Sequence, residues 1–318
     1  MAVTGASGYL ASALIDALQE SSAHILRVSR RDLPPVSGAE ILRADVRTSD
    51  CWEKIVSIAD VIFHLAGNTS VYAAAKNPAD SLNSTVLPIT HLVAAVQAAR
   101  HRRRVVFAST ATVYGLTNDL PVTEDTEPKP ITNYDLHKLF AERQLEMATK
   151  QGLLEGVSLR LANVYGPSSS KSSSVDRGVL NRITMMALQG VDLQLYGDGK
   201  YIRDYIYIDD VVRAFMVAGE EKRVVGQSFN VASGKGITVR EIFRLVAEKA
   251  EEVTGKSLCV ENVPWPPGAD PIEFRNFVAD VTSFQNFADW RPMINLNEGV
   301  NRMIEHFSNN IKSGSVRP

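Results

Sequence analysis

Cysteine is scarce in this chain, because its 318 residues include only two, Cys51 and Cys259. They stand far apart and not in Cys-x-x-Cys spacing, so the sequence contains neither a disulfide framework nor the ligand spacing of a zinc site. We therefore expect no metal site and a reducing, cytoplasmic compartment. Long apolar runs are missing as well, and without a stretch of ~18 such residues we expect no membrane helix. The short start Met1-Ala2-Val3 predicts no signal peptide.

An excess of charge of one sign is also missing. The formal net charge is -2, with 22% charged and 45% hydrophobic residues. This balance excludes the electrostatic footprint of a nucleic-acid binder or of a protein bound to an acidic membrane surface. The one basic cluster, residues 100–104, is predicted to be a solvated link between a helix and a strand. The chain is long enough for one large domain or two lobes.

What the sequence does contain is an alternation of short β-rich runs with longer helical patterns. After the first run, Ala11, Leu14, Ile15 and Leu18 recur at the spacing of a helix with one buried stripe. The alternation predicts βαβ units, and hence an α/β fold with a Rossmann-type doubly wound parallel sheet. Strands are expected at 2–4, 24–29, 40–44, 61–65, 105–108 and 157–161, of which 61–65 and 105–108 are apolar enough to be central.

The amino-acid composition changes after Pro167. Residues 168–174 are rich in serine, and residues 260–270 are rich in proline and predicted to be irregular loop. We predict a dinucleotide-binding Rossmann domain over residues 1–167, with strands returned to it from about 205–230. Residues 168–318 are predicted to form a smaller, mixed α/β C-terminal lobe that binds the substrate.

A glycine-rich string, Gly5-x-x-Gly8-x-x-Ala11, follows the first strand and opens the first helix. This is the context that a dinucleotide fingerprint requires. Gly5 allows a tight turn, Gly8 lets the backbone approach a pyrophosphate, and Ala11 permits close packing of helix and sheet. The helix N-terminus then offers N–H groups and a partial positive charge to the phosphates. The string predicts a bound dinucleotide.

The residues after the second predicted strand indicate which dinucleotide binds. An acidic residue there would hydrogen-bond the ribose 2′-hydroxyl of NAD, whereas arginine accommodates the 2′-phosphate of NADP. This chain has Ser29-Arg30-Arg31 and no acidic residue before Asp32. Because the guanidinium fork suits phosphate, the sequence favours NADP over NAD within an NAD(P) site.

The pattern Tyr-x-x-x-Lys occurs three times, and only a helix brings its two side chains together. Tyr196-Gly-Asp-Gly-Lys200 is predicted to be a turn, and Tyr72-Ala-Ala-Ala-Lys76 has no hydroxyl-bearing strand end a suitable distance before it. Tyr134-Asp-Leu-His-Lys138 follows N-cap residues and lies downstream of Thr110, at the end of a buried strand. We therefore expect the last copy to be the functional one.

Thr110, Tyr134 and Lys138 could together move a proton while a dinucleotide moves a hydride. A free tyrosine has a pKa of about 10 and is a poor base at neutral pH. An ammonium one helical turn away, together with a cationic nicotinamide, favours the phenolate and lowers that pKa. The Thr110 hydroxyl can hold the substrate oxygen against the phenol.

With these strings in place, nearly the whole chain resembles the extended short-chain dehydrogenase/reductase family, in its NAD-dependent epimerase/dehydratase branch that acts on nucleotide sugars. The resemblance implies a catalytic role for Thr110, Tyr134 and Lys138. The strings that carry it are Asp45-Val46, His64-Leu-Ala-Gly67, Asn83, Ser109-Thr-Ala-Thr-Val-Tyr-Gly115, Arg160-Leu-Ala-Asn163-Val-Tyr-Gly-Pro167, Arg203-Asp-Tyr-Ile-Tyr-Ile-Asp-Asp210, Phe229-Asn-Val-Ala-Ser233 and Phe277-Val-Ala-Asp280. The implied cofactor-binding residues are Gly5, Ser7, Gly8, Tyr9, Leu10, Ser29, Arg30, Arg31, Asp45, Val46, Leu65, Ala66, Gly67, Asn83, Tyr134 and Lys138. The implied substrate-binding residues are Thr69, Ser70, Thr110, Thr112, Asn163, Arg203 and Arg275.

Two departures from the branch narrow the function. The 4,6-dehydratases of this family place an Asp-Glu pair directly after the catalytic threonine, and here that place holds Ala111-Thr112, which argues against dehydration. A second arginine for the substrate diphosphate is expected near residues 268–270, where this chain has proline instead. Arg275 is the candidate to replace it.

The first hypothesis is a 4-epimerase of a nucleotide-linked hexose, similar to UDP-glucose 4-epimerase, with transient transfer of the C4 hydride to the bound nicotinamide. An NADPH-dependent reductase of a nucleotide-linked 4-keto-6-deoxyhexose is the alternative that Arg30 and Arg31 favour. A reductase of a small non-nucleotide ketone and a non-catalytic NADP-binding protein are more distant alternatives. The resemblance also implies a homodimer, with helices around 84–100 and 134–150 at the interface and Leu87, Leu92 and Val96 along the first of them.

Overall fold

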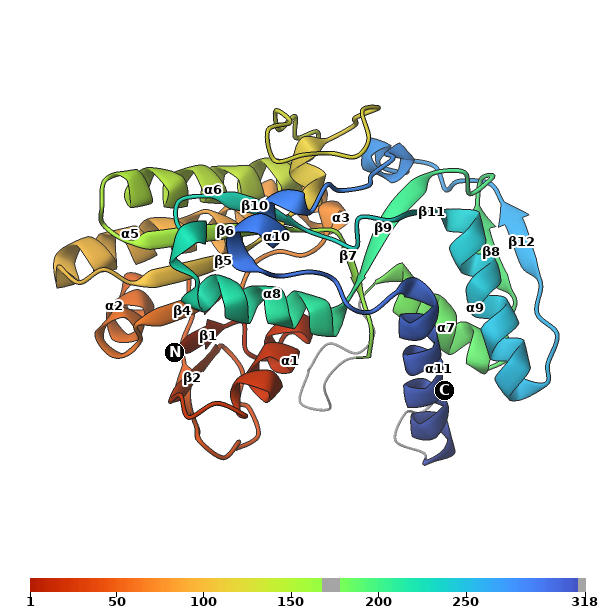
Figure 1. Ribbon diagram of the computed structural model, residues 1–318, viewed down its shortest axis with the longest axis horizontal. Coiled ribbons are helices and arrows are strands. Elements are labelled where there is room, and N and C mark those ends of the chain that lie inside the picture. The colour runs from red at the N-terminus through yellow and green to blue at the C-terminus, as the bar shows by residue number, and fades with distance from the viewer. Residues whose placement is uncertain (168–177, 314–318) are drawn as a thin grey trace.

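The computed structural model describes residues 1–167 and 178–313. Its centre is a seven-stranded parallel sheet with the strand order β10-β6-β5-β4-β1-β2-β3 (Figure 1). The chain runs outward from β1 in both directions, which confirms the predicted doubly wound Rossmann-type sheet. The strands are β1 (Ala2–Thr4), β2 (Ile25–Ser29), β3 (Ala39–Arg43), β4 (Val61–His64), β5 (Arg104–Thr110), β6 (Glu155–Leu161) and β10 (Ser228–Val231).

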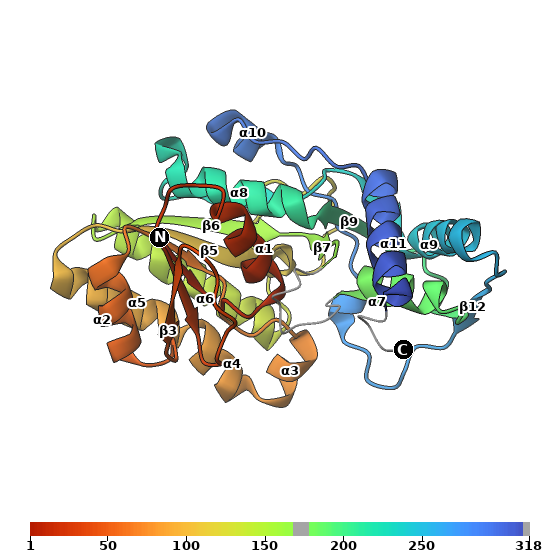
Figure 2. The same ribbon diagram turned by 90° about the horizontal axis from the view of Figure 1, so that it is seen from below.

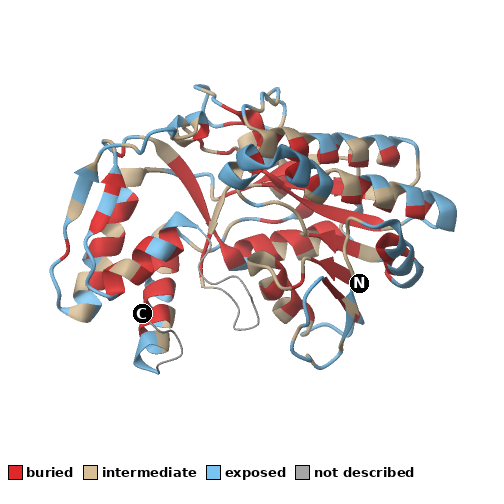
Figure 3. Cartoon of the chain, turned by 180° about the vertical axis from the view of Figure 1, so that it is seen from behind, coloured by how far each residue is buried: buried red, intermediate tan, exposed pale blue. Residues whose placement is uncertain are grey.

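Helices cover both faces of this sheet (Figure 2). One face carries α1 (Tyr9–Leu18) and α8 (Ile208–Glu220), and the other carries α2 (Ser49–Ile58), α5 (Leu87–Ala99) and α6 (Asn133–Lys150). Successive residues of a central strand therefore enter different cores: Val106 packs on the α1 and α8 side, and Val105 on the α2 and α5 side. The central strands are buried on both faces, as their apolar sequences predicted (Figure 3).

The second lobe is built from short strands and three long helices. Its three-stranded sheet has the order β11-β9-β7, with β9 parallel to β7 and antiparallel to β11, and β8 pairs with β12 in parallel. The bounds are β7 (Asn163–Tyr165), β8 (Leu193–Tyr196), β9 (Ile202–Tyr207), β11 (Gly236–Thr238), β12 (Val260–Val263), α7 (Val179–Leu188), α9 (Val239–Thr254) and α11 (Leu296–Lys312). The shorter helices of the described residues are not confined to this lobe, and most of them contact elements of the large sheet's lobe; they are α3 (Val71–Lys76), α4 (Pro78–Thr85), α10 (Thr282–Ala288) and the 3-10 turns η1 (Ala111–Tyr114), η2 (Lys222–Val224) and η3 (Pro271–Phe274).

The chain crosses between the lobes more than once. After β9 it returns to the large sheet, where α8 packs on one face and β10 pairs with β6. It then leaves again to form β11 and α9. The predicted serine-rich loop 168–174 lies outside the described residues, and the division at residue 167 therefore stays a prediction.

Two local predictions were wrong in part. The proline-rich segment is not irregular throughout, because Val260–Val263 forms β12. The basic cluster is not simply solvated, because Arg104 is buried and donates to the carbonyls of Ala218 and Glu221 at the end of α8.

Helices α4 and α5 together give one helical stretch, Pro78–Ala99, that is long and apolar enough to span a membrane by length and composition alone. That stretch packs against α2 and α6.

Candidate active site

The turn after β1 and the loop after β4 touch each other at the carboxyl edge of the sheet. Gly5 has φ +69°, and a Cβ atom there would lie 2.9 Å from both the Cα and the N atom of Ala66. No side chain larger than hydrogen fits at this point. Leu65, Ala66 and Gly67 are thereby held directly beside the start of α1, as expected of a loop that lies under a dinucleotide.

The N-terminus of α1 suits an anion. Gly8 is its N-cap, and in the described part of the chain no side chain caps this helix and no acidic residue stands in its first turn. Ala11 is buried against the sheet, and Tyr9 donates from its hydroxyl to the Gly166 carbonyl at 2.8 Å. Ser7 and Leu10 belong to the same turn. Backbone N–H groups and the helix dipole are therefore available for a pyrophosphate.

The predicted ribose and adenine contacts stand at the ends of β2 and β3. The buried hydroxyl of Ser29 accepts from the backbone N–H of Arg31 at 3.0 Å, while the side chains of Arg30 and Arg31 are exposed. Asp45 accepts from Arg47 Nε at 3.0 Å and Nη2 at 2.6 Å, which holds the pKa of its carboxyl below the ordinary value, with a smaller contribution from Arg30. Val46 accepts from the Trp52 indole at 2.7 Å, and Asn83 is exposed on α4.

The three predicted catalytic residues come from two elements. Thr110 ends β5 and caps η1, where its Oγ1 accepts from the Thr112 N–H at 3.2 Å. Tyr134 lies in the first turn of α6, and Lys138 follows one turn later with its Nζ 6.0 Å from the Tyr134 ring centroid. A Cβ on Gly67 would lie 3.6 Å from that Nζ, so the loop after β4 also reaches the pair.

The other two copies of the Tyr-x-x-x-Lys pattern lie elsewhere. Tyr72 lies in the first turn of α3, and the hydroxyl of this exposed side chain donates to Glu273 at 3.3 Å. Tyr196 ends β8, and the positive φ angles of Gly197 and Gly199 place the residues after it in a turn. Neither copy stands beside a strand end of the large sheet.

Burial governs the charge of the Tyr134 and Lys138 pair. It raises the pKa of Tyr134 to about 12, although a hydrogen bond with Thr110 and the positive charge of Arg275 act in the opposite direction. It lowers the pKa of Lys138 to about 8, with Glu142 acting to raise it. The expectation that Lys138 would lower the phenol pKa is therefore not met in the protein alone, because desolvation outweighs the nearby charges.

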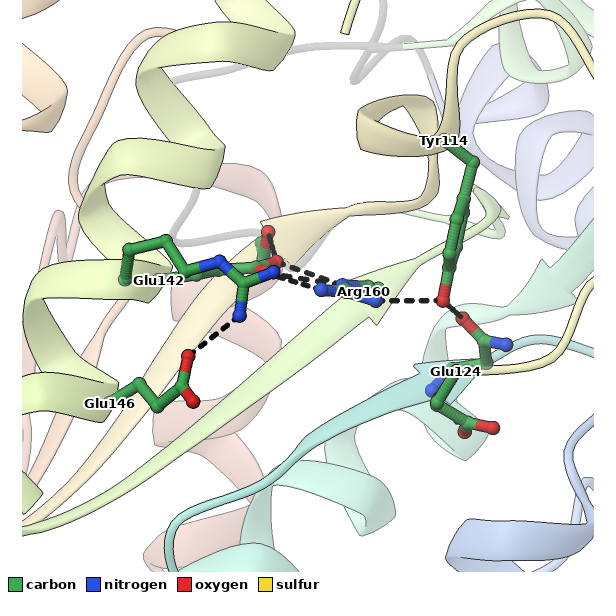
Figure 4. Close-up of polar contacts among 8 residues, drawn as sticks. Tyr114, Glu124, Glu142, Glu146 and Arg160 are labelled. Atoms are coloured by element: carbon green, nitrogen blue, oxygen red, sulfur yellow. Dashed lines mark hydrogen bonds and ion pairs between the residues drawn. The ribbon is translucent and has the colours of Figure 1, made fainter. Parts of the chain in front are cut away.

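A buried polar network behind the strand end supports this geometry (Figure 4). Glu142 of α6 accepts from Ser109 and, at 2.8 Å from Nη2, from Arg160 of β6. Arg160 donates to the Tyr114 hydroxyl at 2.9 Å, which donates to Asn230 at 2.8 Å. The network joins α6, β5, β6 and β10 directly behind Thr110. Sequence reasoning missed Glu142, whose one signal was its position a single turn after Lys138.

Two arginines of the second lobe lie near the carboxyl edge of the large sheet. Arg203 of β9 donates to the carbonyls of Glu273, at 2.6 Å, and Arg275, and burial lowers its pKa to about 10 with a further contribution from the Arg275 charge. Arg275 donates to the Ile272 carbonyl at 2.9 Å and to Asn163 Oδ1 at 3.4 Å. The predicted residues Thr69 and Ser70 follow Gly67, and Ser70 caps α3.

A small cavity joins the two halves of the site. It has a volume of about 40 Å³ and is lined by Thr110, Ala111, Thr112, Leu161, Ala162, Asn163, Arg275 and Phe277. The structure therefore brings the predicted Thr110, Thr112, Asn163 and Arg275 together beside Tyr134. Sequence reasoning also missed Asp135, a fully buried carboxylate next to Tyr134. Among the described residues, no group of three or more His, Cys, Asp or Glu residues could hold a metal ion.

Known proteins resemble this chain in both sequence and structure. The UDP-glucose 4-epimerase of Mycolicibacterium smegmatis is 28% identical over 320 residues, which covers 96% of this chain and 98% of that protein. The crystal structure of UDP-glucose 4-epimerase from Thermotoga maritima with UDP-glucose aligns with a TM-score of 0.85 and 28% identity, covering 98% and 99% of the two chains. MoeE5 in complex with UDP-glucose and NAD aligns with a TM-score of 0.82 and 30% identity, with the same coverage.

The model of one protein family, described as the NAD dependent epimerase/dehydratase family, matches residues 1–232. The match runs from β1 to the residue after β10 and so includes the whole large sheet. The dinucleotide turn, the Thr110, Tyr134 and Lys138 cluster and the relatives all agree with it. The chain therefore belongs to the NAD dependent epimerase/dehydratase family, in the nucleotide-sugar branch of the extended short-chain dehydrogenases/reductases.

Proposed function

We propose that this protein is a 4-epimerase of a UDP-linked hexose that works by transient hydride transfer to a bound nicotinamide. The observation that carries the proposal is the shared cavity, in which Thr110 of the large sheet faces Asn163 and Arg275 beside the Tyr134 phenol. The side of the cavity with Thr110 can thus hold a sugar hydroxyl, and the side with Asn163 and Arg275 can hold an anion. Relatives that act on UDP-sugars favour uridine as the base.

Each residue has a separable role in this proposal. Tyr134 takes the proton of the C4 hydroxyl and later returns it, and Thr110 orients the C4 oxygen toward the phenol. Lys138 holds a positive charge beside that exchange. Arg203, Arg275 and Asn163 bind the diphosphate, because a guanidinium fork matches phosphate oxygens and the present partners of both arginines are uncharged oxygens.

The chain has a cradle for NAD. The Gly5 turn is too close to Ala66 for any side chain, and the N-terminus of α1 is uncapped, so the backbone itself can approach a pyrophosphate. When bound, the nicotinamide would accept the C4 hydride and return it to the opposite face of the sugar. Gly5, Ser7, Gly8, Tyr9 and Leu10 would hold the pyrophosphate. The list of further proposed contacts is Ser29, Asp45, Val46, Leu65, Ala66, Gly67, Asn83, Tyr134 and Lys138.

The second candidate is an NADPH-dependent 4-ketoreductase of a nucleotide-linked sugar. It is favoured by Arg30 and Arg31, which follow Ser29 in the sequence and are exposed. No acidic residue stands between Ser29 and these two arginines. The preference for NADP over NAD belongs to this candidate. A reductase of a small ketone has less support, because it would have no use for Arg203 and Asn163.

We also propose a homodimer through α5 and α6. Leu92 and Val96, two of the residues expected at this interface, instead point into the protein's own core. The outer surface of α6 carries Phe140, 46% exposed, and Met147, 56% exposed, one above the other two turns apart. A reducing, cytoplasmic setting is proposed with it, and the free state of Cys51 and Cys259 supports this.

The test is a panel of UDP-glucose, UDP-galactose, UDP-glucuronic acid and UDP-N-acetylglucosamine, incubated with the purified protein with and without NADPH. Interconversion at C4 without added NADPH supports the epimerase. Consumption of NADPH by a nucleotide-linked 4-keto sugar supports the reductase instead. If no sugar nucleotide is altered or bound in any arm, both candidates are wrong.

A further inference from the structure

Three polar groups converge beside Gly67, in the loop after β4. A Cβ atom built at this glycine would lie 3.6 Å from Lys138 Nζ, 3.7 Å from the Ser84 carbonyl oxygen and 3.8 Å from Thr85 Oγ1. Apart from the glycine and its chain neighbours, these are the three heavy atoms nearest to that point, and all three distances are ordinary contacts. The point beside Gly67 therefore admits one small group, and its surroundings are polar.

The Ser84 carbonyl can accept a hydrogen bond from outside its own helix. Ser84 lies in the last turn of α4, which continues into α5 as one helical stretch. In an unbroken α-helix its carbonyl would accept from the N–H of the residue four places later. That residue is Pro88, which has no N–H. The sequence therefore leaves this carbonyl without the donor that a helix normally supplies.

The Thr85 hydroxyl is the second independent sign of a ligand at this point. Its residue is 1% exposed, and among the described residues Oγ1 has no hydrogen-bond partner. A buried hydroxyl without a partner is costly, so a native structure normally supplies one, from the protein or from an ordered water. Asn83, two residues earlier on the same helix, is exposed instead. Thr85 is therefore the α4 side chain that faces Gly67.

The chemistry of the three groups defines what can bind between them. The Lys138 ammonium only donates hydrogen bonds, and the Ser84 carbonyl only accepts them, whereas the Thr85 hydroxyl can do either. A ligand at this point must therefore accept from the ammonium and donate to the carbonyl. The carbonyl disfavours an anion, and the ammonium disfavours a cation. A water molecule meets both demands, and three partners are the usual number for a buried water.

We propose that these three groups bind one water molecule beside Gly67, and that Thr85 is thereby a positioning residue for the Lys138 ammonium. The Ala108 carbonyl already accepts from this ammonium at 2.8 Å. With the water as a second acceptor, Lys138 is held by β5 on one side and by α4 on the other, one helical turn after Tyr134. The role of Lys138 in turnover rests on the proposed function, whereas the water site does not.

A dry site is the competing explanation, and it predicts the opposite change in stability for one substitution. Valine has nearly the shape of threonine without the hydroxyl. In a dry site, Thr85→Val removes an unpaired buried polar group and should stabilise the fold. In a hydrated site, the same substitution takes a partner from the water and should destabilise the fold. The sign of the change therefore separates the two explanations.

Three variants make the test. Thr85→Val removes the hydroxyl, and Thr85→Ser keeps it. Thr184→Val is the control for loss of a buried threonine hydroxyl elsewhere, because Thr184 is fully buried in α7 and donates to the Leu180 carbonyl at 2.8 Å. The melting temperature of each variant is measured, together with kcat and KM for the UDP-sugar that the wild type converts.

Thr85→Val is expected to lower the melting temperature and to reduce kcat about tenfold, the effect of losing one hydrogen bond to a charged group, with little change in KM. Thr85→Ser should restore both quantities, and Thr184→Val should leave kcat unchanged. A higher melting temperature with unchanged kcat in Thr85→Val overturns the proposal. A loss of kcat that Thr85→Ser does not rescue overturns the positioning role.

High-resolution crystal structures give a readout that needs no substrate. In the wild type, with and without NAD, a water is expected within hydrogen-bond distance of Lys138 Nζ, the Ser84 carbonyl and Thr85 Oγ1, and it should be lost in Thr85→Val. No density at this point, or an oxygen that appears only with NAD and belongs to its ribose, overturns the proposal. If the UDP-sugar panel fails and the water is seen, only the proposed function is wrong; if the panel succeeds and the water is absent, only this inference is wrong.

Discussion

Lys138 donates a hydrogen bond from its Nζ to the Ala108 carbonyl at 2.8 Å. The ammonium on α6 is therefore tied to β5, two residues before Thr110. This contact fixes the helix against the strand at the point where the predicted acid–base residues meet. The register between α6 and β5 consequently decides whether Thr110 and Tyr134 can act on the same substrate atom.

Tyr134→Phe is expected to abolish turnover and leave the affinity for NAD nearly unchanged. General acid–base help contributes about 10²–10⁴-fold in rate, and the phenol is the proposed proton carrier. The measurement is kcat on the preferred UDP-sugar, together with calorimetric titration of NAD. Tyr72→Phe is the matched control, because its hydroxyl lies on exposed α3. Near-normal rates in the Tyr134 variant with loss in the Tyr72 variant would reverse the assignment.

Lys138→Met is expected to lose activity and gain stability at neutral pH. Burial lowers the pKa of Lys138 from 10.5 to about 8, so the folded state disfavours the ammonium by roughly 3 kcal/mol below pH 8. After loss of the bond to Ala108, a net gain of about 2 kcal/mol in the free energy of unfolding is expected. The wild-type deficit disappears as the pH rises from about 8 to 10.5, so the variant should lose its advantage over that range and the two stability curves should cross. Denaturant unfolding across that range checks it, and curves that stay parallel would contradict it.

Gly5→Ala is expected to weaken dinucleotide binding and destabilise the fold. The new Cβ would stand 2.9 Å from the backbone of Ala66, and φ at this position is +69°. Gly38→Ala is a matched control, since Gly38 has φ +70° with nothing within 4 Å of an added Cβ. The positive φ alone costs about 1–2 kcal/mol. Unfolding and NAD titration of both variants isolate the clash, and equal losses at the two positions would refute it.

Arg30→Ala combined with Arg31→Ala is expected to remove a preference for NADP(H) over NAD(H). A charge-assisted contact contributes about 1.5–3 kcal/mol, which corresponds to roughly tenfold to a hundredfold in affinity. Calorimetric titration of both dinucleotides into the wild type and the double variant measures it. Arg43→Ala, at the end of β3 and ion-paired to Asp32, is the control. Equal affinities in the wild type remove the argument for a reductase.

Phe140→Asp with Met147→Asp is expected to convert a homodimer to monomers. Both side chains are exposed on the outer surface of α6, where a charge would disfavour an apolar interface. Sedimentation velocity at micromolar concentration is the measurement. Met293→Asp, at a side chain 66% exposed, is the control for a surface charge elsewhere. A monomeric wild type would disprove the dimer.

The parts of the site that depend on local sequence pattern could be predicted from the sequence. The order of strands and helices, the turn at Gly5 and the helical Tyr134 and Lys138 pair all follow from periodicity, glycine positions and N-cap residues. Glu142 could not be predicted in the same way. Its partners Ser109 and Arg160 are distant in sequence, and only the packing of α6 on β5 and β6 brings them together. Arg275 reaches the site from a loop whose path no periodicity describes.

The last strand of the large sheet, β10, has a consequence for how the protein is made. It joins the sheet beside β6 only after the chain has already built β7, α7, β8 and β9. It also carries Asn230, which accepts from Tyr114 and is the last member of the buried polar network. A nascent chain therefore cannot complete this edge of the large sheet until residue 231 has left the ribosome. A polypeptide that ends after the first lobe lacks β10, the strand that pairs with β6.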